Sequence, residues 1–125
     1  MFDMYVNITI KNNTSILDKS LNFFVKDSGI VISLKITDLK YYMCLQRSIS
    51  DFYGVKLLVK GSNGYTYIAS LKVEDEYIKI PVGSLNGLIT KEEGTFDCQL
   101  LIYNSEFELL ALPPFKYTVE KLLSY

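Results

Sequence analysis

Hydrophobic and polar side chains alternate with a period of two along much of this chain. The clearest run is Ile30 to Thr37, in which isoleucine or leucine occupies every second position. Phe115 to Glu120 repeats the pattern directly after Pro113 and Pro114, and proline fits only at the start or the edge of a strand. Such alternation is typical of half-buried strands, so the sequence predicts a β-protein.

Turn signals separate the predicted strands at intervals of roughly 8 to 12 residues. The strongest is Gly61–Gly64, because glycine and asparagine tolerate the positive φ of tight hairpin turns. Asp27–Gly29 predicts a further hairpin that pairs Leu21 to Lys26 with Ile30 to Thr37. A loop or a single helical turn is expected at Gly83–Gly87. The other predicted strands are Tyr5 to Lys11, Val55 to Lys60, Tyr65 to Val73, Tyr77 to Val82, Phe96 to Tyr103 and Phe107 to Leu112.

These elements predict one all-β domain over residues 1–125. The expected fold is a single antiparallel immunoglobulin-like β-sandwich of about eight or nine strands. The inter-sheet disulfide of immunoglobulin domains packs on a tryptophan, which this chain lacks. Cys44 and Cys98 are therefore expected to be separate free thiols, with Cys98 buried on the face that carries Phe96, Leu100 and Ile102.

The segment from Asp38 to Tyr53 follows neither period, although Leu39, Tyr42, Met43 and Gln46 would share the face of a short helix. Aromatic side chains gather there beside an arginine, a combination enriched in protein interfaces. They could instead pack over the open end of the core or stack on sugar rings. The candidate protein-interface residues are Tyr41, Tyr42, Arg47, Phe52 and Tyr53, with Tyr65 and Tyr67 as further candidates on the hairpin.

Charge and composition exclude several classes of function. Thirteen basic and fourteen acidic residues leave a net charge of −1, without the concentrated basic face that nucleic acids require. No apolar run approaches the length of about 18 residues that spans a bilayer, so no membrane partner is expected. The N-terminus carries no secretory signal, which predicts synthesis in a cytoplasm.

The catalytic inventory is small. The chain has no histidine, the commonest general base and zinc ligand, and it has no glycine-rich phosphate loop. The acidic cluster Glu74–Glu76 lies between two predicted strands, as expected for a solvated turn rather than a calcium loop. We therefore expect no enzymatic activity, no catalytic residue, no cofactor, no metal and no small-molecule substrate.

Three segments resemble one known family. Pro113-Pro114-Phe115 followed by Tyr117 to Lys121, Leu21 to Gly29 with the strand after it, and Tyr53 to Lys60 resemble the N-terminal domain of phage baseplate upper proteins, from tailed phages of Gram-positive bacteria. The resemblance implies a structural, anchoring domain that docks on the tail baseplate and carries receptor-binding components. It also implies a place in the virion, phage tail and baseplate proteins as partners, and a homo-oligomer in the assembled particle.

A carbohydrate-binding or host-adhesion module is the alternative, because a sandwich fold alone does not define a function. Three or four coplanar aromatic rings on an exposed face would favour sugar binding. An unpaired strand edge beside an apolar patch would favour docking to another protein.

Overall fold

The structure is a computed structural model, and it describes residues 1–37 and 54–123. This part of the chain forms ten strands and no helix, which confirms the all-β prediction. The strands are β1 (Phe2–Lys11), β2 (Thr14–Leu17), β3 (Asn22–Phe24), β4 (Ile30–Ile36), β5 (Gly54–Gly61), β6 (Thr66–Glu74), β7 (Tyr77–Val82), β8 (Gly94–Tyr103), β9 (Leu109–Ala111) and β10 (Phe115–Glu120).

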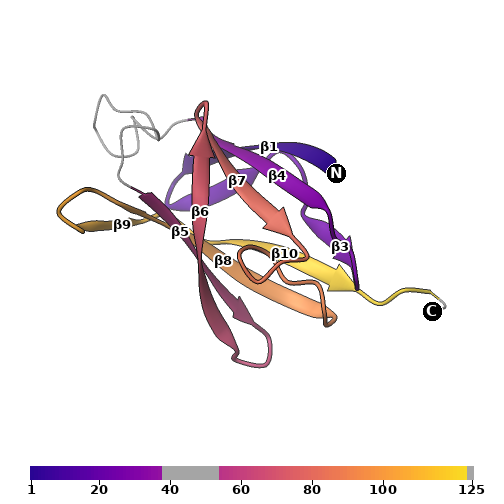
Figure 1. Cartoon of the computed structure of the whole chain (residues 1–125). Helices are drawn as coiled ribbons and strands as arrows, with labels where there is room; N and C mark the ends of the chain where they lie inside the picture. Colours follow the sequence, from indigo (N-terminus) through magenta and orange to yellow (C-terminus); the bar gives the residue numbers. More distant parts are fainter. Residues whose placement is uncertain (38–53, 124–125) are drawn as a thin grey trace.

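The strands belong to one mixed sheet rather than to an antiparallel two-sheet sandwich. Their order is β2-β1-β4-β7-β6-β5-β8-β10-β3, with β9 paired to β8. The sheet curls strongly on itself into a half-barrel around the core (Figure 1). The prediction of an immunoglobulin-like sandwich is therefore corrected. The two halves of the curled sheet are not separate sheets, because β6 pairs with a strand in each of them. Its first part, Thr66–Leu71, pairs with β5, and its last three residues, Lys72–Glu74, pair with β7.

The predicted hairpin between β3 and β4 does not form. β4 lies between β1 and β7, and β3 pairs in parallel with β10. The turn between them is held locally, since the Asp27 carboxylate accepts a hydrogen bond from the Phe24 N–H at 2.8 Å. Lys26, at φ 77°, donates its N–H to the Thr90 carbonyl at 3.0 Å. These contacts hold the turn that leads from β3, the last strand in the sheet order, to β4, which lies near the opposite end of that order.

The predicted hairpin at Gly61–Gly64 is present, and a second one was missed. Gly64 has φ 85°, and the Gly61 N–H donates to the Tyr65 carbonyl at 2.8 Å. Asn12 and Asn13, at φ 53° and 58°, form a two-residue turn that pairs β1 with the short strand β2. Asparagine tolerates this left-handed conformation better than most residues, which explains why the turn forms without glycine.

The core fills the inside of the curl, and it contains the side chains that alternation predicted. Phe96, Cys98, Leu100 and Ile102 of β8 are buried, as are Phe115, Tyr117 and Val119 of β10. The register places Phe115 opposite Cys98 and Tyr117 opposite Phe96, whose rings stack with centroids 4.6 Å apart. The prediction of which side chains of β8 and β10 point into the core is therefore confirmed.

Candidate functional site

The interface residues that the sequence singles out, Tyr41, Tyr42, Arg47, Phe52 and Tyr53, lie outside the described residues. The short helix expected in the same segment and Cys44 lie there too. What the structure gives are the two strands that flank this segment: β4, which ends at Ile36, and β5, which begins at Gly54. The role of these five residues in a protein interface therefore stays a prediction, as does the free thiol of Cys44.

Tyr65 and Tyr67, the hairpin candidates, have different surroundings. Tyr65 is 58% exposed. Tyr67 is half-buried, and its hydroxyl donates to the Gly87 carbonyl at 2.7 Å and accepts from the Ile89 N–H at 3.2 Å. Tyr67 therefore holds the loop after β7 in place, and its hydroxyl is not available to a partner.

A second tyrosine reaches the same loop from β10. The Tyr117 hydroxyl donates to the Ile89 carbonyl at 3.0 Å. Burial raises the pKa of Tyr67 and of Tyr117, so both hydroxyls stay protonated. Burial also raises the pKa of the free Cys98 thiol, which leaves it a poor nucleophile. This interior cluster is structural.

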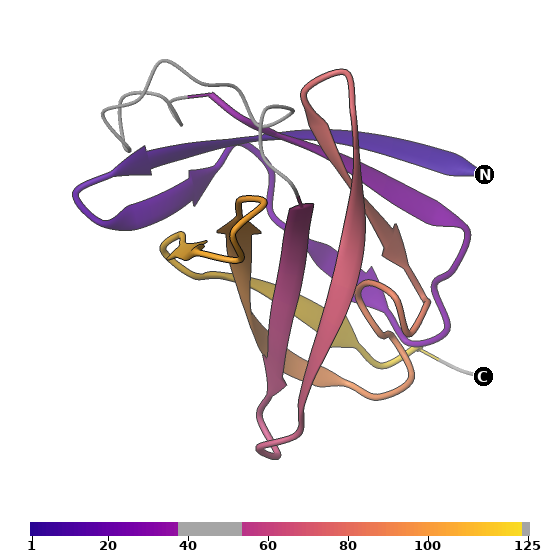
Figure 2. The same cartoon turned by 60° about the vertical axis from the view of Figure 1, so that its left-hand side comes forward.

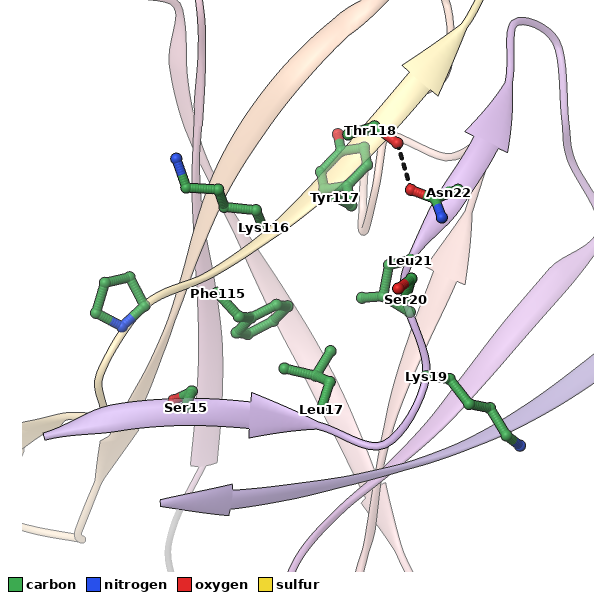
Figure 3. A pocket seen from close by; sticks show the side chains of 11 residues that line it. Ser15, Leu17, Lys19, Ser20, Leu21, Asn22, Phe115, Lys116, Tyr117 and Thr118 are labelled. Carbon is green, nitrogen blue, oxygen red and sulfur yellow. Dashed lines mark hydrogen bonds between the residues drawn. The ribbon is translucent and has the colours of Figure 1, made fainter. Parts of the chain in front are cut away.

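A hollow lies at the seam of the curl, where the two ends of the sheet approach each other. Figure 3 shows that β2, β10 and the connection through Lys19–Asn22 surround it, with Leu17, Leu21 and Phe115 directed inward. Its volume is about 410 Å³. The seam is closed at one end by the Ser15 hydroxyl, which donates to the Pro113 carbonyl at 2.5 Å. At the other end, the Thr118 N–H donates to the Leu21 carbonyl at 2.9 Å.

A second gap opens where β6 and β7 separate. The strands share a two-residue turn, Asp75–Glu76, and diverge from it (Figures 1 and 2). Continued by two residues, their register would join Ser70 to Pro81. Proline has no N–H to donate, and the Pro81 carbonyl already accepts from the Leu88 N–H at 2.9 Å. Pro81 therefore ends the ladder and creates a fork in the sheet.

The fork leaves one edge of β6 unpaired. Because Gly61 and Tyr65 form a hydrogen-bonded pair, the antiparallel pattern directs the backbone groups of Tyr67, Ala69 and Leu71 toward β5. Those of Thr66, Ile68 and Ser70 point the other way, and they have no backbone partner within residues 1–37 and 54–123. This segment is called the β6 edge below. Ile68 is 59% exposed.

Lysines lie next to the β6 edge on the outer surface. Lys72 and Lys79 are directly opposite each other across β6 and β7. The Lys79 ammonium donates to the buried Ser33 hydroxyl at 2.7 Å and lies 5.6 Å from the centroid of the Tyr77 ring, and the Lys35 ammonium lies 5.9 Å from the same centroid. Among the described residues, none of the three lysines forms an ion pair.

A groove of about 350 Å³ joins the edge and the lysines. Its walls come from β6, β7 and the loop after β7, and its floor includes apolar side chains. The lining residues are Val31, Ser70, Leu71, Lys72, Lys79, Pro81, Ser84 and Asn86. Sequence reasoning missed this site, although the Asp75–Glu76 turn predicts the Lys72–Lys79 pairing once it is read as a two-residue hairpin.

The arrangement of these groups suits the binding of another protein. No group of three or more histidine, cysteine, aspartate or glutamate side chains that could hold a metal ion occurs among the residues that the structure describes. No helix capable of crossing a membrane occurs there either. The fork instead combines free backbone donors and acceptors, ammonium groups and an apolar floor, which are the features of a protein-binding groove.

The sequence matches no protein-family model and no curated protein. Among solved structures, the chain is similar to the N-terminal domain of ORF48 from phage TP901-1, with a TM-score of 0.61 and 13% sequence identity. The match covers 97% of this chain and 100% of that domain. ORF48 is the baseplate upper protein of its phage. The resemblance inferred from the sequence is therefore confirmed at the level of the fold.

Proposed function

We propose that this chain is a structural domain of a phage or prophage tail, which docks on the baseplate and carries receptor-binding components. The observation that carries the proposal is the structural match to the N-terminal domain of ORF48, which extends over nearly the whole of both chains. Residues 1–125 would then act as one anchoring domain within the virion, made in the cytoplasm of the host and without enzymatic activity.

The surface of the described residues supports docking to a protein. An unpaired strand edge beside an apolar patch is the feature that favours this class of function over sugar binding. The β6 edge lies beside the groove floor formed by Val31, Leu71 and Pro81. The candidates between Tyr41 and Tyr53 remain sequence-based proposals for a second part of the docking surface.

Sugar binding finds less support in the same surface. The Tyr65–Tyr67 rings meet at 37° and the Tyr5–Tyr77 rings at 79°, so neither pair makes a flat platform. Tyr103 and Phe107 are closer to parallel, at 17°, and within residues 1–37 and 54–123 they give two such rings rather than three or four.

Gene deletion in the encoding phage or prophage tests the proposal. Tail particles purified from the wild type should contain the chain, and particles from the deletion strain should lack both the chain and their receptor-binding components. Re-expression of the chain should restore these components, as measured by mass spectrometry of the particles. Particles of unchanged composition apart from the missing chain would contradict the proposal.

A further inference from the structure

We infer that the β6 edge receives an extended, acidic segment of a partner protein, which adds to the sheet as a strand in the fork between β6 and β7. This inference rests on the proposed function and names the chemistry of the partner at that site. Three independent features of the fork carry it: the unpaired backbone, the facing lysines and the apolar floor.

The unpaired backbone fixes the conformation of the ligand. Thr66, Ile68 and Ser70 direct N–H and C=O groups into the fork, with no β-strand opposite them in the described chain. Groups in this alternating arrangement are best satisfied by another extended backbone, the mode of recognition called strand addition. Pro81 keeps the edge free, because its missing N–H prevents β7 from pairing there.

The lysines fix the charge of the ligand. Like charges directly opposite on neighbouring strands destabilise a sheet, and Lys72 and Lys79 occupy such a pair. Lys79 is held toward β4 by Ser33, while Lys72 is exposed. Glu74 lies two residues from Lys72 on the same face but makes no ion pair in the described part of the chain. A carboxylate placed between the two ammonium groups would remove their repulsion.

The groove floor distinguishes a protein from a nucleic acid. Val31, Leu71 and Pro81 offer apolar surface directly beside the lysines, which suits alternating acidic and apolar side chains of an added strand. Nucleic acid would instead require a wider basic face than three lysines in a chain of net charge −1.

The opposite wall of the groove is firmly held. The loop after β7 packs on Pro81 so closely that a Cβ on Gly87 would come within 2.0 Å of the Pro81 carbonyl oxygen. The Tyr67 hydroxyl binds the same loop at Gly87 and Ile89. The groove in the fork is therefore already formed in the free protein.

Two matched pairs of variants test the inference with tail particles of the encoding phage, assembled without the chain. Lys72→Glu should weaken particle association at least tenfold, whereas Lys60→Glu, an equal charge change on exposed β5 surface, should change it less than twofold. Ser70→Pro removes the backbone N–H of residue 70, which points into the fork, and leaves the hydrogen bonds between β6 and β5 in place. It should abolish particle association, whereas Ser70→Ala, which keeps this N–H, should not. Circular dichroism checks that each variant is folded.

Three outcomes would overturn the inference. If the wild-type chain associates with particles and Lys72→Glu and Ser70→Pro do so equally well, the strand-addition site is wrong while the proposed function stands. If the wild-type chain does not associate at all, both fail. If Lys72→Glu loses binding to a DNA duplex but keeps particle association, the lysines serve a nucleic acid and the acidic protein segment is wrong.

Discussion

The seam between β2 and β10 and the fork between β6 and β7 are both gaps in the curled sheet, yet they are built in opposite ways. Contacts within the chain close the seam at both ends, through Ser15 with Pro113 and Thr118 with Leu21. The fork is kept open by Pro81, and the loop that follows forms one of its walls instead of filling it. A closed gap contributes to stability, whereas an open one with a free edge is available for a partner.

The largest expected contrast is in hydrogen exchange along β6. The amides of Tyr67 and Ala69 bond to β5, so they should open only with the core, while those of Ile68 and Ser70 face the fork. For a domain of ordinary stability, we expect at least about a thousandfold faster exchange at Ile68 and Ser70. Amide exchange followed by NMR on the free protein measures this. Uniform protection of all four amides would mean that the fork is closed.

The floors of the two gaps should differ in their contribution to stability. Phe115 at the seam is buried, and Phe115→Ala should lower the free energy of unfolding by about 3–5 kcal/mol through lost transfer energy and a cavity. Leu71 at the fork is only partly buried, so Leu71→Ala should cost about 1–2 kcal/mol. Denaturant unfolding of both variants gives the comparison. Equal losses would show that the fork belongs to the core.

Local patterns predicted the strands better than their partners. The alternation of Phe96 to Ile102 and of Phe115 to Val119 follows from burial on one face, which a sequence records directly. The parallel pairing of β1 with β4 depends on long-range packing, which no local period encodes. β2 was missed because its first residues, Thr14 and Ser15, are polar and the strand is only four residues long.

The candidate site shows the same limit. Its residues are ordinary strand residues one by one, and Pro81 interrupts no alternation because Tyr77 to Val82 still reads as a strand. Only the register set by the turn at residues 75–76 brings Lys72 opposite Lys79, and only its continuation would place Pro81 opposite Ser70. Sequence reasoning instead selected the aromatic residues between Tyr41 and Tyr53, because composition alone gives a signal there.

The loop after β7, which forms one wall of the fork, should depend on the Tyr67 hydroxyl for part of its stability. Tyr67→Phe leaves the Gly87 carbonyl and the Ile89 N–H without this partner, so the free energy of unfolding should fall by about 1–2 kcal/mol. Tyr65→Phe is the matched control, because Tyr65 is exposed and the change should stay within about 0.5 kcal/mol. Chemical denaturation measures both variants. If Tyr67→Phe left the free energy of unfolding unchanged, the loop would be held by its own backbone contacts.

The smallest expected effect lies near the seam and depends on pH. The Asp18 carboxylate accepts hydrogen bonds from the Asn7 N–H at 2.9 Å and from its side-chain amide at 3.0 Å. The backbone hydrogen bond from Asn7 is the main cause that lowers the pKa of Asp18 below 3.8. Because the folded pKa is the lower one, the stabilisation is fully present above the ordinary carboxyl pKa and is lost as the pH falls through the folded value.

Asp18→Asn should therefore lower the melting temperature slightly at pH 7 and by less at pH 2, because acid protonates the wild-type carboxyl as the pH falls through its folded pKa. Thermal unfolding at the two pH values measures the difference, and Asp3→Asn, at an exposed position of β1, provides the control for a simple loss of charge. An equal change at both pH values, or the same profile for Asp3→Asn, would show that the Asn7 contact does not hold β1 to the connection after β2.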